Sequence, residues 1–387
     1  MAAAKRLYLD HAATTPILPA AQAAMVDAMA NWANPSSPHA DGRAARAVLE
    51  DARRRIAGAL GWGGHVIFTS GASEAIAIGL GRSKAGRVVT STVEHDAVLR
   101  VTPGAARIGV DGLGGVNLPV HLRESGDMLS VGADGSVGGP MDPRLRGDDE
   151  ERAGDDSAWC KGGDGAVLLA IQHVNNETGV IQPLDRIERA GAILFADCAQ
   201  SAGKLPLPDA DLIAISAHKF GGPPGIGALL VRDLALLHPS GGQEQGYRAG
   251  TENVPAIMGM AAALEQGFGW VATAALLRAR LDAGIEATGG VIVARDAPRL
   301  ATIASYRMPG LSARAQLIQF DLAGISVSAG SACSSGSLKT SHVLGAMGWD
   351  EAAAGEVVRV SFGATTSEAD VDRFLLAWTA MVGRVAR

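Results

Sequence analysis

The stretch Leu212-Ile213-Ala214-Ile215-Ser216-Ala217-His218-Lys219 begins as an uncharged apolar run and ends in polar side chains. A short run that is rich in isoleucine and leucine predicts a buried β-strand over 212–216. A histidine and a lysine directly after such a strand are poorly placed as solvated surface groups. The stretch therefore predicts a strand that presents polar groups at its carboxyl end.

Apolar runs with polar ends recur along the chain and alternate with helical patterns. Helices are predicted over 17–32, 42–60 and 72–81. Further strands are predicted at 7–9, at 66–69 before Ser70-Gly71, at 88–91 before Glu94-His95, at 167–174 before Asn175-Asn176-Glu177, at 192–196 before Asp197 and at 226–231. This alternation is typical of an α/β fold with a mostly parallel sheet flanked by helices, and such sheets bind ligands at the carboxyl ends of their strands.

Two regions depart from this pattern. Residues 112–165 are rich in Gly, Asp and Arg, and they lack periodicity after Val131. We expect residues 131–164 to be an exposed, disordered insertion. The pattern restarts near Glu265 with a helix, followed by strands near Gly290 and Ile303, which predicts a second, smaller domain of the α+β class.

The overall composition limits which classes of protein this chain can belong to. A chain of 387 residues with 47% hydrophobic residues can bury a large core, and a net charge of −6 does not favour a nucleic-acid partner. The scattered cysteines Cys160, Cys198 and Cys333 form no disulfide framework and no C-x-x-C metal pair, so we expect a reducing compartment. No signal-peptide core or membrane-length apolar run is present, and we expect a cytoplasmic protein without membrane association.

Several residues allow two interpretations, one as part of a functional site and one as a purely structural group. The turn from Ser70 to Glu74 either binds an anion at a helix start or is a tight turn capped by Ser73, and by itself it favours the capped turn. Asp197, at a strand end, either pairs with a protonated ring nitrogen or caps a helix. Arg359, in an apolar run, either binds a substrate carboxylate or pairs with a structural carboxylate, and the second would be favoured without context.

The lysine and one cysteine give sharper signals. Lys219 follows a buried strand, where desolvation lowers the pKa of an amine and suits it to act as a nucleophile and base; a surface-reaching lysine is the alternative. Cys333 lies in Ser328-Ala329-Gly330-Ser331-Ala332-Cys333-Ser334-Ser335-Gly336-Ser337, which we expect to be a mobile loop and not a core element. An exposed cysteine there is a candidate nucleophile, whereas Cys160 and Cys198 are expected to be incidental.

In combination these residues resemble the cysteine desulfurases, pyridoxal-phosphate enzymes of the class V aminotransferase group with the aspartate-aminotransferase fold. The motifs run in order: Tyr8 to Pro16, Asn34 to Ser37 with Gly42-Arg43, Phe68 to Glu74, Glu94-His95, Asn175 to Gly179, Asp197 to Gln200, Ser216 to Lys219, Gly250-Thr251, the Cys333 stretch with Ser341 to Leu344, and Arg359 with Ser361 to Gly363. The resemblance implies a large cofactor domain over 15–264. It also implies a small domain of 1–14 and 265–387 that carries the cysteine.

The resemblance also implies roles. Lys219 would hold the cofactor as a Schiff base, His95 would stack on its ring and move protons, and Cys333 would carry the persulfide. The other implied cofactor contacts are Asp197 at the ring nitrogen, Gln200 and Asn176 at the phenolic oxygen or substrate, and Ala72, Ser73, Ser216, His218 and the Thr251 of a homodimer partner around the phosphate. Asn34 and Arg359 would hold the substrate carboxylate.

The implied activity is removal of sulfur from L-cysteine, which gives L-alanine and a persulfide for iron–sulfur scaffold or sulfur carrier proteins, in cluster assembly or tRNA thiolation. A selenocysteine lyase, another class V transaminase or lyase, and an inactive sulfur scaffold remain as alternatives. The chain departs from the family at Ala75-Ile76-Ala77, where polar residues are common, at Lys339-Thr340, and over 112–165.

Overall fold

The computed structural model describes residues 6–30, 32–117, 121–122, 128–129, 166–187, 189, 191–332 and 338–385. The insertion expected at 131–164 and Cys160 therefore lie outside the described residues. So do residues 333–337, which include Cys333.

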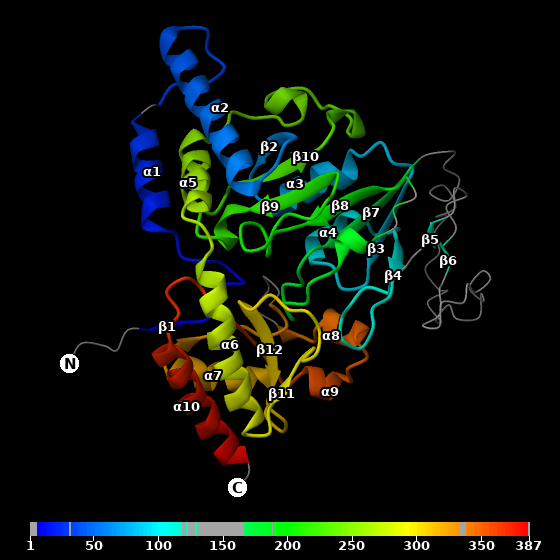
Figure 1. The fold of residues 1–387 in the computed structure, drawn as a ribbon, viewed down its shortest axis with the longest axis vertical. Coiled ribbons are helices and arrows are strands. Elements are labelled where there is room, and N and C mark those ends of the chain that lie inside the picture. The colour runs from blue at the N-terminus through cyan, green and yellow to red at the C-terminus, as the bar shows by residue number, and fades with distance from the viewer. Residues whose placement is uncertain are drawn as a thin grey trace.

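A seven-stranded sheet forms the centre of the larger part of the molecule (Figure 1). Its order is β2-β10-β9-β8-β7-β3-β4, and all neighbouring pairs are parallel except those of β10 with β2 and β9. The strands are β2 (His65–Thr69), β3 (Arg87–Ser91), β4 (Ala106–Ile108), β7 (Val167–Gln172), β8 (Ile193–Asp197), β9 (Leu212–Ser216) and β10 (Gly227–Val231). The mostly parallel α/β architecture predicted from the sequence is confirmed.

Alternate side chains of each strand pack into two different cores, as the two-residue period of a strand requires. In β8, Leu194 and Ala196 face one core with helices α2 and α5, whereas Ile193 and Phe195 face the other with α3 and α4. Figure 1 shows α1, α2 and α5 side by side along the sheet. These helices are α1 (Pro19–Met29), α2 (Ala40–Leu60), α3 (Ala72–Gly81), α4 (Asp96–Val101) and α5 (Val254–Glu265).

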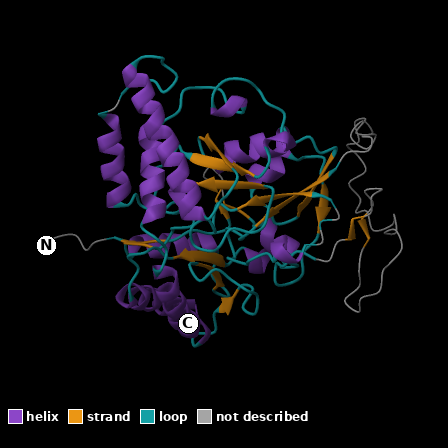
Figure 2. Cartoon of the chain, turned by 45° about the horizontal axis from the view of Figure 1, so that its top comes forward, coloured by secondary structure: helices purple, strands orange, loops and turns teal. Residues whose placement is uncertain are grey.

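A third core surrounds the three-stranded antiparallel sheet β11-β12-β16. Figure 2 shows the strands and helices of the chain by colour. The elements of this core are β11 (Val291–Ile292), β12 (Ile303–Arg307), β16 (Val357–Ser361), α6 (Trp270–Glu286), α7 (Ala313–Leu322) and α10 (Glu368–Val385). The short helices α8 (His342–Ala346) and α9 (Glu351–Ala354) pack in a separate smaller cluster. The N-terminal strand β1 (Leu7–Tyr8) pairs with β13 (Ile325–Ser326), so the chain start lies with this C-terminal part. The boundary at 264/265 stays a prediction.

Short elements complete the described structure. They are the strand pairs β5 (His121–Leu122) with β6 (Met128–Leu129) and β14 (Ser331–Ala332) with β15 (Leu338–Lys339), and the 3-10 turns η4 (Leu184–Arg186), η5 (Ala217–Lys219), η6 (Leu234–Leu236) and η7 (Glu244–Gly246). Within the Cys333 stretch, which was predicted to be a mobile loop and not a core element, Ser331 and Ala332 form β14, and β15 follows directly after the stretch. The mobility of the loop stays a prediction.

The helix predicted to start near Glu265 is α6, and helix α5 before it was not predicted. Helix α5 ends at Glu265 and α6 begins at Trp270, and Gly267 between them has a φ of 72° that breaks the helix. Among the described residues no single helix is long and apolar enough to cross a membrane; α5 and α6, bent by 70°, pass that test only as a pair and only by length and composition.

Candidate active site

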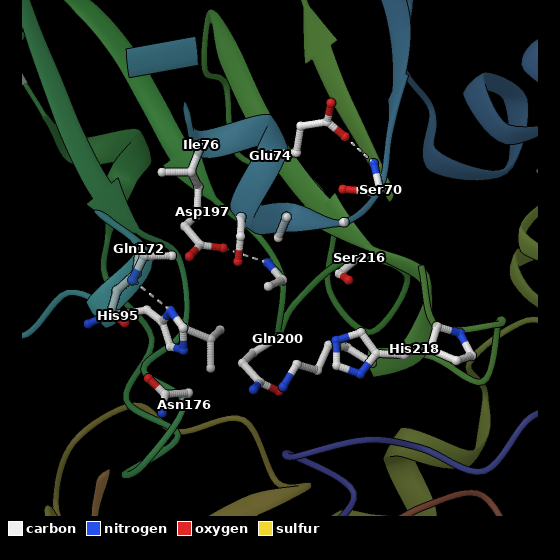
Figure 3. A pocket seen from close by; sticks show the side chains of 18 of the residues that line it. Ser70, Glu74, Ile76, His95, Gln172, Asn176, Asp197, Gln200, Ser216 and His218 are labelled. Carbon is white, nitrogen blue, oxygen red and sulfur yellow. Dashed lines mark hydrogen bonds between the residues drawn. The ribbon is translucent and has the colours of Figure 1, made fainter. Parts of the chain in front are cut away.

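A cavity of about 380 Å³ lies at the carboxyl edge of the parallel strands (Figure 3). Its walls come from the ends of β7, β8 and β9, from the loop after β3 and from the first turn of α3. Residues predicted from the sequence that line it are Ala72, Ser73, His95, Asn176, Asp197, Gln200, Ser216, His218 and Lys219. The strand ends thus bring together polar groups from distant parts of the sequence.

One end of the cavity is the uncapped N-terminus of α3. The helix begins at Ala72 after Gly71, and no side chain caps it. The first intrahelical bond runs from the N–H of Ala75 to the carbonyl of Gly71, so the preceding N–H groups have no acceptor within the helix. The prediction that Ser73 caps this helix was wrong, because Ser73 lies inside the first turn. Free N–H groups and the helix dipole make this turn suited to an anion.

The backbone at Gly71 shapes this turn. Its φ of 154° and ψ of 179° fall in a region that is essentially restricted to glycine. A Cβ at this position would lie 3.6 Å from Oγ of Ser216. The turn therefore brings the hydroxyl of Ser216, at the end of β9, close to the start of α3.

Lys219 lies in the short turn η5 after β9, and its amine is largely buried. Nζ donates to the carbonyl oxygens of Ala12 at 2.6 Å and Ala13 at 2.9 Å. Burial, with a further contribution from the Arg359 charge, lowers the pKa of Lys219 to about 8, although Asp197 and Asp10 oppose the shift. A substantial fraction of the amine is therefore neutral near physiological pH.

Asp197 ends β8 and points into the cavity (Figure 3). Its Oδ1 accepts from the N–H of Ala199 at 2.9 Å, and none of the described residues donates to Oδ2 in the structure. Burial raises the pKa of Asp197, while the Ala199 N–H and the charges of His95 and Lys219 favour the ionised form. A carboxylate in this position suits a cationic donor.

The orientation of His95 is fixed by its own helix. Nδ1 accepts from the N–H of Ala97 at 3.1 Å, so a neutral ring carries its proton on Nε2. Gln200 also lines the cavity, and its Nε2 donates to the carbonyl of Ala12 at 2.9 Å. The Oε1 atom of Gln200 is buried and has no partner among the described residues, so it remains available to a ligand.

Three of the predicted residues that the structure describes do not line this cavity. Arg359 is buried in β16, where Nη2 donates to Oδ1 of Asp10 and Nη1 to the carbonyl of Asn176, both at 2.9 Å. Arg359 thus pairs with a structural carboxylate, while its Nε has no partner among the described residues, and the substrate-binding role stays a prediction. Asn34 accepts from the N–H of Ser36, Thr251 lines a separate small cavity, and Cys333 lies outside the described residues.

Cys198 is fully buried beside Asp197. Burial raises the pKa of its thiol far above the usual range, and its Sγ lies 3.9 Å from Nδ1 of His173. A thiol that stays protonated is a poor nucleophile, which fits the incidental role predicted for Cys198.

Sequence reasoning gave no role to two buried glutamates, although both stand in quoted motifs. Glu94 is fully buried, and its carboxyl group accepts from Oγ of Ser91 at 2.5 Å and from the N–H of Gln172 at 2.9 Å. Burial raises the pKa of Glu94 to about 8. Glu177 is also buried and bonds to Ser341. Both could have been found from the sequence, because each is a charged residue directly beside a predicted site residue, His95 or Asn176, after an apolar run.

Gln172, Val174 and Ile76 also line the cavity and were not predicted to do so. Ile76 belongs to the departure at 75–77, and it supplies an apolar wall beside Asp197 (Figure 3). No group of three or more His, Cys, Asp or Glu side chains that could hold a metal ion occurs among the residues described.

Comparison with known proteins agrees with this geometry. The family model described as aminotransferase class-V matches residues 7–110 and 163–374. The IscS-like cysteine desulfurase of Mycobacterium tuberculosis is 36% identical, over 98% of this chain and 97% of that protein. A cysteine desulfurase of Cereibacter sphaeroides is 33% identical, over 96% and 94% of the two chains.

Solved structures show the same fold. A NifS-like protein from Rickettsia africae matches with a TM-score of 0.80 and 27% identity, over 98% of this chain and 99% of that chain. A structure of SspA in complex with cysteine matches with a TM-score of 0.71 and 26% identity, over 93% and 100% of the two chains. The chain therefore belongs to the class-V aminotransferase family and, within it, to the cysteine desulfurases.

Proposed function

We propose that this protein is a pyridoxal-phosphate-dependent cysteine desulfurase that converts L-cysteine to L-alanine and keeps the sulfur as a persulfide on Cys333. The observation that carries the proposal is the meeting of Lys219, Asp197 and His95 in one cavity beside the uncapped start of α3. A partly neutral amine, a buried carboxylate and an anion site are the groups that a phosphorylated pyridine aldehyde requires.

The chemistry of the donor set fits this cofactor. The phosphate would bind the free N–H groups at 72–74 with the side chains of Ser73, Ser216 and His218. The amine of Lys219 would bind the aldehyde carbon, and Oδ2 of Asp197 would accept from the protonated ring nitrogen. Gln200 and Asn176 would contact the phenolic oxygen or the substrate, and His95 would cover the ring. When bound, the cofactor supplies an electron sink for charge that develops on the substrate.

Side chains of the protein would transfer the protons that the reaction requires. With a pKa of about 8, Lys219 can take the α-proton of the substrate as a neutral amine and return it as an ammonium group. The Nε2–H of His95 is a donor on the cavity side that can relay a proton to the departing alanine. Asn34 and Arg359 would hold the substrate carboxylate, with Asp10 orienting the guanidinium.

Sulfur transfer balances without an external oxidant. The thiolate of Cys333 attacks the sulfur of L-cysteine, an S–S bond forms, and the Cβ–S bond of the substrate breaks with its electron pair left on carbon. Protonation of that carbon gives L-alanine. The sum is L-cysteine plus the Cys333 thiol giving L-alanine plus the Cys333 persulfide.

The assembly and the acceptor belong to the same proposal. Thr251 is exposed on the loop before α5, so it can reach the phosphate of a second copy in a homodimer. The persulfide would pass to protein acceptors such as iron–sulfur scaffold or sulfur carrier proteins in the cytoplasm. Neither a nucleic acid nor a membrane is part of the proposed reaction.

The test is an assay of the purified protein with L-cysteine, pyridoxal phosphate and a reductant. Equal amounts of sulfide and L-alanine are expected. Amino-group transfer to a keto acid without sulfide would instead identify a transaminase, and turnover of selenocysteine alone a selenocysteine lyase. The absence of any reaction and of any absorbance change with L-cysteine would leave the inactive scaffold.

A further inference from the structure

The chain on both sides of residues 333–337 is hydrogen-bonded to segments next to the candidate active site. On the N-terminal side, Ser328 and Arg359 exchange backbone hydrogen bonds of 3.2 and 2.7 Å. Strands β14 and β15 then pair with each other. On the C-terminal side, Ser341 and His342 follow β15 and start α8; we call these two residues the C-terminal root.

Ser341 is buried and uses its hydroxyl twice. Oγ donates to Oε2 of Glu177 at 2.5 Å and accepts from the N–H of Leu344 at 3.1 Å. A hydroxyl has a single proton, and a carboxylate oxygen can only accept, so the direction of both bonds is settled. Ser341 therefore caps α8 and at the same time holds Glu177 through a short charge-assisted bond.

Glu177 connects this bond to the cavity wall. It lies in the tight turn at 175–179, where its N–H donates to Oδ1 of Asn175 and its carbonyl accepts from Oγ of Ser305. The preceding residue, Asn176, lines the cavity and holds Arg359 through its carbonyl. Glu177 itself does not line the cavity, so the bond ties the C-terminal root to the turn that carries Asn176 and not to a lining side chain.

His342 makes the second tie. Its Nε2 lies 3.0 Å from the carbonyl oxygen of Glu94, and because a carbonyl only accepts, Nε2 is the donor. Glu94 is itself immobilised by Ser91 and Gln172, and it directly precedes His95 in the cavity. The two residues of the root therefore bind the two segments that present Asn176 and His95.

We propose that Ser341 and His342 are positioning residues for sulfur transfer, which fix the C-terminal root of the segment carrying Cys333 to Glu177 and Glu94. This inference rests on the proposed function. A nucleophile that is tethered close to its target has a high effective concentration, and loosening one end of the tether lowers it. Neither residue touches the reacting atoms, so the cofactor steps do not depend on them.

The experiment separates positioning from helix capping at Ser341. Asp is as good a helix N-cap as Ser, so Ser341→Asp keeps the cap of α8 but places a negative charge against Glu177. We expect single-turnover persulfide formation on Cys333 to slow at least tenfold in Ser341→Asp and His342→Ala. The absorbance change on adding L-cysteine should stay close to wild type in both variants. The melting temperature should stay close to wild type in His342→Ala and fall in Ser341→Asp, where two carboxylates meet in a buried site.

Conservative variants should restore the rate. Ser341→Thr retains the hydroxyl, and His342→Gln retains an N–H donor, so the persulfide rates of both should stay within about threefold of wild type.

The double variant Ser341→Asp, Glu177→Gln should recover much of the persulfide rate, because the new amide donates to the new carboxylate. The matched control is Ser312→Ala: Ser312 caps α7 through the N–H of Ala315 in the same way but lies outside the cavity, and its loss should not slow persulfide formation.

Persulfide rates equal to wild type in both Ser341→Asp and His342→Ala would overturn the inference. So would a fall in persulfide rate matched by an equal fall in the cysteine-dependent absorbance change, because that would indicate a general structural role. If Ser341→Asp does not fold, the inference is tested with His342→Ala and His342→Gln, by comparing their persulfide rates and absorbance changes with those of wild type. Wild-type protein that forms no persulfide on Cys333 would refute the proposed function instead.

Discussion

Arg359 donates from Nη2 to Oδ1 of Asp10 at 2.9 Å, and this ion pair joins β16 to the N-terminal segment that also supplies the carbonyl partners of Lys219. The side chains are only 8% and 19% exposed, so removal of one partner leaves a charge that water cannot reach easily. We expect Asp10→Asn to lower the free energy of unfolding by about 3 kcal/mol. Urea denaturation checks this.

The same variant tests the orienting role of Asp10. Asp10→Asn should raise the KM for L-cysteine more than it lowers kcat, because Arg359 loses its fixed orientation. Arg6 and Asp321 form an exposed pair nearby, so Asp321→Asn is a matched control that should cost less than about 1 kcal/mol. A KM for Asp10→Asn equal to that of wild type would contradict the role.

The lowered pKa of Lys219 predicts the pH dependence of cofactor loading. The rate at which cofactor-free protein binds pyridoxal phosphate covalently should rise with pH and level off above a midpoint near 8, because the neutral amine is the nucleophile. Stopped-flow absorbance between pH 6 and 10 measures it. A rate that still rises steeply at pH 10 would indicate an ordinary lysine, and a visible band that survives in Lys219→Ala would assign the attachment to another residue.

Glu94 predicts that the stability of the folded protein falls as the pH rises. Its pKa is raised to about 8 by burial, so the folded protein holds this proton more tightly than the unfolded chain. The resulting stabilisation is complete below the usual glutamate pKa and is lost as the pH rises through 8. Melting temperatures of wild type and Glu94→Gln should therefore converge toward pH 5, with the variant gaining relative to wild type toward pH 8. Parallel curves would exclude a raised pKa.

Residues 131–164 should be dispensable for cofactor binding. This stretch is polar and aperiodic, and the class-V family model leaves residues 111–162 unmatched. A deletion of 131–164 joined by a short Gly-Ser linker is expected to keep the visible cofactor band and a melting temperature within a few degrees of wild type. If the deleted protein is insoluble or binds no cofactor, the stretch contributes to the core.

Local patterns were enough to predict the elements that frame the site. Helix α3 and strand β9 were predicted with the bounds observed, because each is a short apolar stretch that begins or ends at small or polar residues. Helix α5 was missed because it is buried on nearly all sides and so has no polar face to reveal a helical period. The six-residue helix α4 is too short to show a period at all.

Site residues were predictable where polar groups follow buried strands. Asp197, Ser216 and Lys219 were found in this way, and the cavity contains all of them. The bonds from Lys219 to Ala12 and from Ser341 to Glu177 were not predictable, because they join residues that are far apart in the sequence and depend on how distant segments pack. The Arg359 partner remained open for the same reason.

Persulfide labelling after one turnover tests the central claim most directly. Protein loaded with pyridoxal phosphate is mixed with one equivalent of L-cysteine, alkylated and digested, and the cysteine-containing peptides are identified by mass spectrometry. The proposed function predicts one added sulfur atom on Cys333, none on Cys160 or Cys198, and no labelling in Cys333→Ala, which should still change the cofactor absorbance with L-cysteine. Added sulfur on Cys198, or undiminished sulfide release by Cys333→Ala, would contradict it.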